Sequence, residues 1–362
     1  MDDARIQPVD DESESQNWKR DDIVARILRR WRELTGDKHT RDGDRRTLVA
    51  CSGGADSIAL AFALSRISGS SVIAHIRHDI RSEEETDADR ELVRFRAEQW
   101  GVEFVSRDIR VKSLPGNLEA NARSGRYSVL QDLAEEHDCP YIATGHHADD
   151  QLETLLMHLM RGSGLRGMTG MRAKTQLERS TLVRPMLDIP RDEIVQMLRR
   201  AAITWRDDPT NQDHAYFRNR IRHDVVPMMR SVCPSIAARA SDWTNDLMSI
   251  RAMMDEMIDK AIGDASSTPD GMIWDRRVFR SFPEPVLGML PNRVCRLLCA
   301  NQGQDLISRE TINAWIRGVK SFSTEPTQHR IGPMVCFIDA HRVRIAPVSD
   351  VEQDGTEAQY ES

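Results

Sequence analysis

Apolar and polar positions alternate along the first half of the chain in two kinds of segment. The first kind is a short apolar run, which predicts a buried strand, and it occurs at residues 47–51, 71–76, 102–106 and 141–145. The second kind has apolar residues at helical spacing or polar residues typical of helix ends, and it covers residues 23–34, 57–68, 82–101, 117–137 and 148–161. Strands that alternate with helices in this way predict a doubly wound parallel α/β sheet. Ligands of such sheets bind at the carboxyl ends of the strands.

The pattern changes in the second half of the chain and predicts mostly helices. Apolar residues from Trp243 to Ala261 recur at alternating spacings of four and three, which indicates one long helix. Ser308 is placed to cap a further helix, and residues 334–346 are typical of a hairpin of two short strands. We therefore expect a smaller, mainly helical C-terminal domain that begins near Pro227.

Charge is distributed unevenly over the 362 residues, whose net charge is −7. Residues 1–22 hold eight acidic and three basic residues, and residues 349–362 hold five acidic and no basic ones. Both ends are predicted to be disordered tails, which leaves domains at residues 23–226 and 227–348. Residues 161–230 hold fourteen basic and eight acidic residues, a balance that suits a polyanion such as nucleic acid and equally an ordinary mixed-charge surface.

The sequence argues against membrane-spanning and secreted proteins, and against disulfide or metal–thiolate sites. No apolar run reaches the roughly 18–20 residues that a membrane span requires, and the acidic N-terminal segment lacks the apolar core of a secretory signal. The six cysteines form no C-x-x-C pair, which argues against a disulfide framework and against zinc or iron–sulfur sites. We therefore expect a cytoplasmic protein without a membrane partner, whose cysteines are small buried thiols.

The segment Ser52–Gly53–Gly54–Ala55–Asp56–Ser57 joins the first predicted strand to its helix. Glycines let the backbone turn tightly and approach a ligand, and a helix start offers unpaired N–H groups and a positive dipole end. These features predict an anion site, most simply for phosphate. The segment is neither a Walker A loop nor a G-x-G-x-x-G motif, and Ser-Gly-Gly alone is more typical of an ordinary capped turn.

The full motif S-G-G-x-D-S after an apolar strand resembles the PP-loop of the ATP pyrophosphatase superfamily. Three further segments, residues 117–127, 143–171 and 206–229, resemble bacterial tRNA(Ile)-lysidine synthetases in order and spacing. The resemblance covers residues 45–230 closely and 231–347 loosely. It implies that ATP, bound with Mg²⁺, is cleaved to AMP and pyrophosphate. The ATP contacts that it implies are Ser52, Gly53, Gly54, Ala55, Asp56, Ser57, His75 and His146.

The same resemblance implies a reaction and its partners. The wobble cytidine of an isoleucine tRNA with a CAU anticodon is adenylated at its C2 carbonyl. The ε-amine of free L-lysine then displaces AMP and gives lysidine. Residues 227–348 are accordingly expected to bind the tRNA, and a homodimer is left open.

Three carboxylates stand at the start of one predicted helix. Asp149, Asp150 and Glu153 share a helix face, where they complement the helix dipole or bind Mg²⁺ or the lysine ammonium group. Because the phosphate loop lies at the same sheet edge, we expect a catalytic role for all three. Asp56 and Asp150 are the candidate magnesium ligands.

Arginines are the other candidate catalytic residues. Guanidinium groups stabilise the charge of an adenylation transition state, and we expect Arg123 rather than Arg126 to do so. Arg218, Arg220 and Arg222 alternate, so that one helix face cannot hold all three; we expect Arg220 in the site and the others at the tRNA backbone. The predicted catalytic set is Asp56, Arg123, Asp149, Asp150, Glu153 and Arg220.

Two positions depart from the family pattern His-x-Asp-His-Gly-Leu-Arg after the second strand. Arg77 stands in place of the acid, where we expect it to contact nucleotide or RNA, and Asp79 stands in place of the glycine. Aspartate tolerates positive φ better than most residues, so the turn is expected to survive.

Two alternative functions remain open. One is another PP-loop enzyme, either a tRNA thiolase or an amide-forming synthetase of small molecules. Thiolation requires a reactive cysteine pair or cluster ligands, which the sequence lacks. The other is a non-catalytic, ATP-dependent RNA-binding module.

Overall fold

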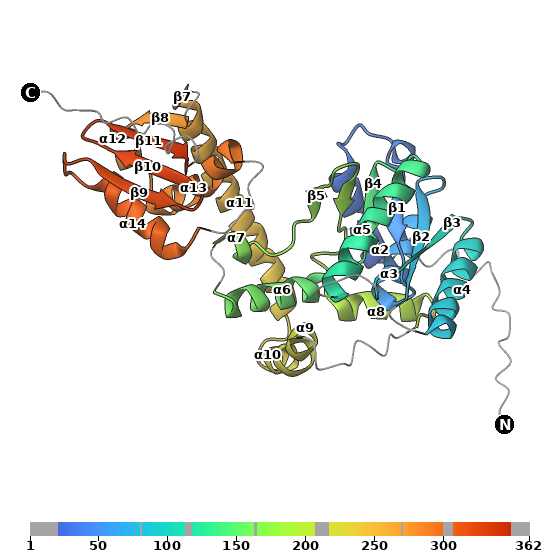
Figure 1. Ribbon diagram of the computed structural model, residues 1–362. Coiled ribbons are helices and arrows are strands. Elements are labelled where there is room, and N and C mark those ends of the chain that lie inside the picture. Colours follow the sequence, from blue (N-terminus) through green and yellow to red (C-terminus); the bar gives the residue numbers. More distant parts are fainter. Residues whose placement is uncertain are drawn as a thin grey trace, which may run out of the picture. The chain divides into compact units, whose positions relative to one another are not determined.

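The computed structural model describes residues 21–79, 82–112, 118–162, 165–206, 217–268, 271–299 and 307–348. The predicted acidic tails lie outside these residues except for Asp21 and Asp22, which begin the first helix. The chain divides into two compact units, residues 1–247 and 248–362. Each unit is described separately (Figure 1).

Unit 1 is built on a six-stranded sheet with the strand order β3-β2-β1-β4-β6-β5. All neighbouring strands are parallel except β5 and β6. The chain adds β2 and β3 on one side of β1 and later strands on the other, so the segments that follow β1 and β4 meet at one crevice. The predicted doubly wound parallel sheet is confirmed. Its strands are β1 (Thr47–Ala50), β2 (Ser71–His78), β3 (Glu103–Ile109), β4 (Tyr141–Thr144), β5 (Lys174–Gln176) and β6 (Thr181–Val183).

Successive strand residues point to opposite faces of the sheet. Both faces carry apolar side chains, and each of them is covered by helices. They are α2 (Asp22–Thr35), α3 (Ala55–Ser65), α4 (Glu83–Gln99), α5 (Leu118–Glu136), α6 (Ala148–Met160), α7 (Leu165–Met168) and α8 (Arg191–Arg200), with a short 3₁₀ turn η2 (Asp42–Asp44). Val49 belongs to the core that packs α2, α3 and α8 on one face. Leu48 belongs to the core that includes Leu130 and Leu133 of α5 on the other. No helix in the described residues is both long and apolar enough to cross a membrane.

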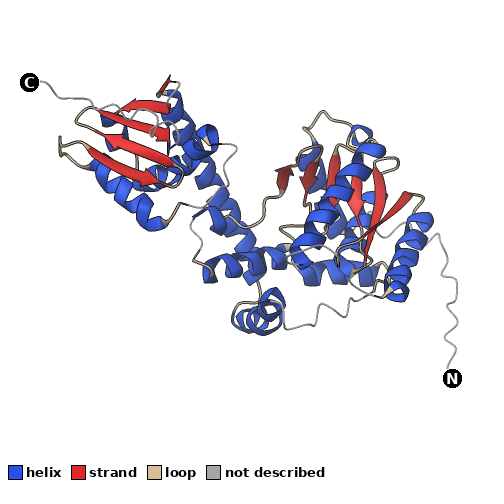
Figure 2. Ribbon diagram, viewed as in Figure 1, coloured by secondary structure: helices blue, strands red, loops and turns tan. Residues whose placement is uncertain are grey.

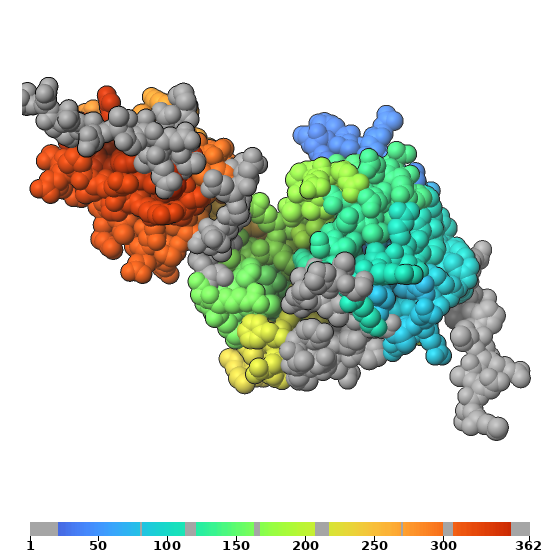
Figure 3. Space-filling model, viewed as in Figure 1, coloured from blue at the N-terminus to red at the C-terminus, as the bar shows by residue number. Residues whose placement is uncertain are grey.

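A second helical group completes unit 1. It consists of α9 (Phe217–Arg220), the π-helical turn η4 (Ile221–Val225), α10 (Val226–Val232) and the first part of α11 (Ile236–Gly263). Val226 and Ala240 pack in one cluster with Leu152 of α6, and Figure 3 shows this region (yellow) at the surface beside α6 (green). Because these contacts tie α10 and the start of α11 to α6, the first compact unit ends after Leu247. The predicted boundary lay earlier, near Pro227.

Unit 2 combines helices with an antiparallel sheet in the strand order β7-β8-β11-β10-β9 (Figure 2). More of its described residues lie in helices than in strands, so the predicted helical character is confirmed. The predicted hairpin is β10 with β11, and Ser308 caps α14 by accepting a hydrogen bond from the Thr311 N–H at 3.1 Å. Three short strands were not predicted. The elements are β7 (Ser266–Thr268), β8 (Gly271–Asp275), α12 (Arg276–Ser281), α13 (Glu284–Leu298), α14 (Arg309–Lys320), β9 (Thr327–Ile331), β10 (Met334–Ile338) and β11 (Arg342–Pro347).

Unit 2 also contains a buried arginine, Arg276, which is 2% exposed. Its guanidinium donates to the main-chain carbonyl oxygens of Gly318, Ser321, Ser323 and Asp339 at 2.7–3.0 Å. The first two of these carbonyls lie at the C-terminus of α14, where a positive charge complements the helix dipole. The side chain therefore joins α14 to the turn between β10 and β11 and has no carboxylate partner within the described chain.

Candidate active site

The first part of the site is the segment that follows β1. Gly53 has a φ of +95°, a conformation that glycine adopts without strain. The Ser57 hydroxyl donates to the Gly54 carbonyl at 2.9 Å and accepts from the Ser52 N–H at 3.1 Å, which closes the loop on itself. Gly54 is the N-cap of α3 and has no side chain to cap it. The first N–H groups of α3 are therefore placed to bind an anion.

The second part of the site follows β4, the neighbour of β1. Gly145 lies directly against α3, since a Cβ at this position would stand 2.8 Å from the Asp56 carbonyl oxygen. Only glycine allows the two segments to approach so closely. His147 follows as the N-cap of α6 and places the first acids of that helix beside Asp56. Two motifs far apart in sequence thus meet at the crevice between β1 and β4.

A cavity of about 410 Å³ opens between these segments. This volume lies within the range of small-molecule sites in proteins. The glycine-rich loop forms part of its wall, together with strand ends and helix starts from the same sheet edge. Its acidic lining residues are Asp56, Asp89 and Asp150, and its arginines are Arg77, Arg123, Arg126, Arg191, Arg206 and Arg222.

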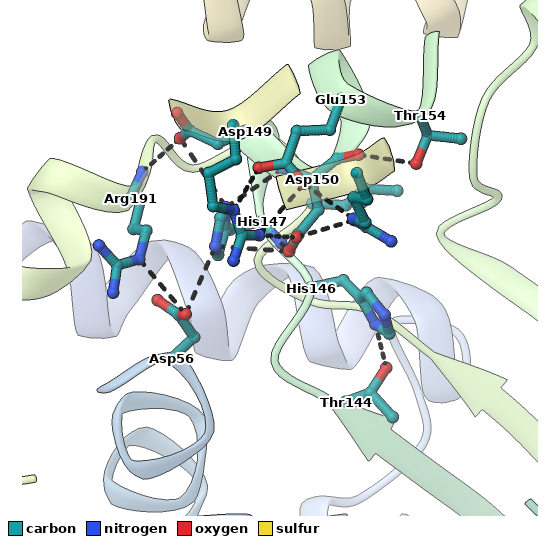
Figure 4. Close-up of polar contacts among 12 residues, drawn as sticks. Asp56, Thr144, His146, His147, Asp149, Asp150, Glu153, Thr154 and Arg191 are labelled. Carbon is teal, nitrogen blue, oxygen red and sulfur yellow. Dashed lines mark hydrogen bonds and ion pairs between the residues drawn. The ribbon is translucent and has the colours of Figure 1, made fainter. Parts of the chain in front are cut away.

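Asp56 is the carboxylate of the loop that lines this cavity (Figure 4). Its Oδ2 lies 3.4 Å from His147 Nε2 and 3.5 Å from Arg191 Nε, and both contacts are long. Its Oδ1 is buried and accepts no hydrogen bond from the described residues. Burial tends to raise the pKa of Asp56, but the hydrogen bond and charge of His147 and the charge of Arg191 hold it below its usual value. The side chain is therefore an incompletely satisfied anion.

His147 bridges the carboxylates of the two motifs. Its buried ring places Nε2 at 3.4 Å from both Asp56 Oδ2 and Asp150 Oδ2. Burial lowers the pKa of the ring, but the carboxylates, Asp150 first, outweigh burial and raise it to about 9. The neutral ring caps α6 by accepting a 3.4 Å hydrogen bond from the Asp150 N–H. The protonated ring gives up this weak bond, and its charge offsets the repulsion between the two acids.

Asp150 and Glu153 are held by two arginines from α9 and η4. Arg218 binds Glu153 at 2.8 Å and Asp150 at 3.0 Å, and Arg222 binds the same two residues at 2.6 and 3.0 Å. The Glu153 side chain is only 1% exposed and does not line the cavity. Burial tends to raise the pKa of Asp150, but His147 and the nearby cations keep it well below its usual value. Of the two acids, Asp150 reaches the cavity and Glu153 supports it from behind.

Asp149 connects three elements instead of facing the cavity. Its Oδ2 accepts a hydrogen bond from the Arg191 main-chain N–H at 2.9 Å, at the first residue of α8. Its Oδ1 is paired with Arg230 of α10. The carboxylate therefore fixes the position from which the Arg191 side chain extends.

Two histidines line the cavity as neutral rings. His146 Nδ1 lies 2.9 Å from Thr144 Oγ1, and burial lowers its pKa to about 3. His75 Nδ1 lies 2.9 Å from the Cys51 carbonyl oxygen, and burial lowers its pKa as well. With Nδ1 committed to the Cys51 carbonyl in this way, the ring of His75 is fixed at the end of β2.

Comparison with known proteins identifies the family. A family model described as a PP-loop domain matches residues 24–229. A tRNA(Ile)-lysidine synthase of Nostoc sp. is 33% identical over 286 residues, which cover 70% of this chain and 82% of the relative. The chain belongs to the PP-loop family of tRNA(Ile)-lysidine synthases. The resemblance inferred from its motifs is thereby confirmed.

Other PP-loop relatives match over shorter parts of their length. The tRNA(Ile)-lysidine synthase of Rhodopirellula baltica is 34% identical over 62% of this chain and 60% of the relative. That of Geobacter sulfurreducens is 36% identical over 61% of this chain and 48% of the relative. The solved structure of the U34-tRNA thiolase NcsA from Methanococcus maripaludis matches 63% of this chain and 79% of that one, with a TM-score of 0.50 and 17% identity. At this identity the likeness supports a shared fold alone.

The structure brings most of the predicted PP-loop site residues together. Of the predicted set, the residues that line the cavity are Ser52, Gly54, Ala55, Asp56, Ser57, His75, Arg123, His146 and Asp150. Gly53 shapes the loop from outside the lining, and Asp149 and Glu153 lie behind it. Arg220 is exposed and lies outside the lining. The arginines that contact the acids of α6 are instead Arg218 and Arg222, which are one helical turn apart and face that helix together. Of these two, Arg222 lines the cavity.

The two candidate magnesium ligands differ in how well they fit a cation. Asp56 has a buried oxygen without a partner and a second oxygen held only by long contacts. Asp150 already accepts hydrogen bonds at both oxygens, from Arg218, Arg222 and the His147 N–H. No cluster of three or more histidines, cysteines and acids that could hold a metal occurs in the described residues. Asp56 therefore fits a Mg²⁺ ion that takes its other ligands from phosphate and water.

Several cavity residues were not predicted. Arg206 donates to Asp89 at 2.7 Å, and its main-chain N–H donates to the Gly53 carbonyl at 3.0 Å. Arg191 reaches the cavity from α8. Arg206 is the first residue of the segment 206–229 that resembles the family, but that resemblance did not single it out. Arg191 lies in none of these segments, so no signal in the sequence pointed to it.

The two departures from the family pattern both have structural partners. Arg77 lines the cavity, but its guanidinium is paired with Asp87 at 2.7 Å and with Asp108. Asp79 is not at positive φ, so its place here does not depend on the tolerance of aspartate for that conformation. Its carboxylate instead accepts hydrogen bonds from the main-chain N–H groups of Val111 and Lys112 at 2.8 and 3.3 Å. The Asp79 side chain thus links the end of β2 to the segment that follows β3.

Proposed function

We propose that the protein uses ATP to join L-lysine to C2 of the wobble cytidine in a CAU-anticodon isoleucine tRNA. ATP adenylates the C2 carbonyl oxygen and releases pyrophosphate. The ε-amine of lysine then attacks C2, AMP leaves, and lysidine is formed. The observation that carries this proposal is the cavity at the end of β1 and β4, lined by the PP-loop and by residues of the other family motifs.

The cavity provides groups for the steps of this reaction. The N–H groups at the start of α3 suit the departing pyrophosphate. Asp56 would hold Mg²⁺, which neutralises phosphate charge when it is bound. Arg123 reaches the lining from α5 without a carboxylate partner in the described chain. Its guanidinium suits the negative charge that develops during adenylation.

The cysteines provide little support for the thiolase alternative. Cys51 borders the loop, but it is 3% exposed, and burial raises the pKa of its thiol to about 11. A thiol with this pKa is protonated and a poor nucleophile at neutral pH. All six cysteines are free, and the described residues contain no group that could hold a metal cluster.

The test is analysis of tRNA nucleosides by mass spectrometry after incubation with ATP and lysine. We expect one cytidine of a CAU-anticodon tRNA to gain the mass of lysine less water, with AMP as the nucleotide product. Release of ADP, or ATP binding without any turnover, would contradict the proposal. The second of these outcomes would favour an RNA-binding module.

A matched pair of variants locates the activity in the cavity. Asp56→Asn keeps the shape of the side chain but removes its charge, and we expect lysidine formation to fall by at least about 100-fold because the cation site is lost. Asp44→Asn makes the same change at an exposed residue of η2 and is expected to retain full activity. Equal activity in the two variants would rule out Asp56 as the cation ligand.

A further inference from the structure

The arginines that line the cavity differ in how much of their charge is already neutralised. Arg77 is paired with two aspartates, Arg206 with Asp89 at 2.7 Å, and Arg222 with Asp150 and Glu153 at 3.0 and 2.6 Å. Short ion pairs of this kind leave little positive charge for a ligand. Three lining arginines have no such partner in the described chain: Arg123, Arg126 and Arg191.

Arg191 is the member of this group that lies next to the glycine-rich loop. Its Nε is 3.5 Å from Asp56 Oδ2, which is the one ion pair that its guanidinium makes with the described residues, and its side chain is 46% exposed. A contact of this length and exposure contributes little stability. The guanidinium can therefore leave Asp56 and turn toward an anion at little cost. Phosphate is a suitable anion, since the guanidinium fork binds it with two parallel hydrogen bonds.

The main chain of Arg191 is fixed even though its side chain is loosely held. Its N–H donates to Asp149 Oδ2 at 2.9 Å, and the other oxygen of Asp149 is paired with Arg230. Arg191 is also the first residue of α8. The buried carboxylate of Asp149 thus sets where the guanidinium emerges, within reach of Asp56 and the loop.

We propose that Arg191 binds the pyrophosphate portion of ATP, and that Asp149 is the residue that positions it. This inference rests on the proposed use of ATP at this cavity. It divides the available positive charge into two subsites. In this division Arg191, next to the glycine-rich loop, contacts the β- and γ-phosphates, and Arg123 and Arg126 of α5 are left for the AMP portion.

The test compares the binding of Mg²⁺–pyrophosphate, AMP and Mg²⁺–ATP by titration calorimetry on the full chain. Arg191→Met should weaken pyrophosphate binding by about 10- to 100-fold, the loss expected for a charge-assisted hydrogen bond, and should leave AMP binding unchanged. Arg199→Met, an exposed arginine on the same helix, should bind all three ligands like the wild type. Arg191→Gln, a neutral residue closer in shape, repeats the test if the methionine variant does not fold.

The outcomes separate this inference from the proposed function. Failure of the wild type to bind ATP or pyrophosphate would overturn the ATP-dependent function itself. Normal pyrophosphate binding by the Arg191 variants, with ATP binding intact in the wild type, would overturn only the role of Arg191. An equal loss for AMP and pyrophosphate would contradict the division into two subsites. Asp149→Asn should show the same selective loss of pyrophosphate affinity, and an unaltered affinity would remove Asp149 from the proposal.

Discussion

Replacing Glu153 by glutamine tests whether this carboxylate holds the site together or takes part in the reaction. The side chain is 1% exposed, lies outside the cavity lining and accepts hydrogen bonds from Arg218 and Arg222 at 2.6–3.1 Å. Glutamine keeps the shape but removes the charge that neutralises these guanidinium groups. Among the described residues, Asp150 would then remain as their one carboxylate partner. We expect the main effect to be on stability.

The magnitude follows from the burial of the pair. Removing one partner of a buried ion pair costs about 3–5 kcal/mol. The glutamine oxygen still accepts one hydrogen bond, and Asp150 still contacts both arginines. We therefore expect the free energy of unfolding to fall by about 2–4 kcal/mol. Glu135→Gln is the matched control: its side chain is 67% exposed and 3.2 Å from Arg179, so a loss below about 1 kcal/mol is expected.

The assay is urea denaturation of both variants followed by circular dichroism, with Mg²⁺–ATP titration of the folded proteins. We expect Glu153→Gln to unfold at lower urea than wild type and still bind ATP within a few fold. A variant with wild-type stability that binds ATP but forms no lysidine would refute this reasoning. Glu153 would then belong to the catalytic groups, as the sequence pattern suggested.

Other substitutions test other contacts. Gly145→Ala should lower the free energy of unfolding by about 1–3 kcal/mol and weaken ATP binding, because the new Cβ would stand 2.8 Å from the Asp56 carbonyl; an unchanged melting temperature would contradict the close approach. Burial lowers the pKa of His146 to about 3, so below about pH 6.5 the unfolded ring takes up a proton that the native ring does not. Stability should therefore fall as the pH decreases from 6.5 to 3, by at most ~1.4 kcal/mol per pH unit, and His146→Gln should flatten this slope in denaturation curves. Arg276→Met should destabilise unit 2 by about 3–5 kcal/mol, because several buried carbonyls lose a charged donor; hydrogen exchange in β10 and α14 measures the loss. Cys51 should resist iodoacetamide at pH 7.5 in the native protein, since burial raises the pKa of its thiol to about 11; peptide mass spectrometry after labelling would detect any modification.

Much of the unit 1 fold follows from local pattern. Apolar runs near residues 47, 71 and 141 form strands with buried residues because two layers of helices cover the sheet, and their positions match the predicted ones. The run near residue 102 also forms a strand, but the prediction that it is buried was wrong, because β3 is an edge strand whose residues are exposed or half-buried. The strands β5 and β6 were not predicted, since three residues are too few to show a period. The same holds for the short strand β7 of unit 2. Such strands form because a neighbouring strand offers an unpaired edge, and that is a property of the assembled sheet.

The site shows a similar division. The positions of the loop at Asp56 and of Asp150 in the site were predictable. The loop follows β1 and Asp150 follows β4, and the carboxyl ends of parallel strands lie at the same edge of the sheet. The alternation of arginines after residue 217 could not indicate which of them face α6. Their partner Glu153 lies far away in sequence, and the π-helical turn η4 alters the spacing of side chains around the helix. The link between Asp149 and Arg191 depends likewise on where α8 begins in space.

The anchoring of Arg276 has a consequence for how unit 2 responds to its surroundings. Its partners are amide oxygens, which neither gain nor lose protons between mild acid and mild alkali. An ion pair between an arginine and a carboxylate loses its attraction when the carboxylate becomes neutral. The contacts of Arg276 join the end of α14 to the turn between β10 and β11 without any carboxylate. Mildly acidic solution should therefore leave this junction intact.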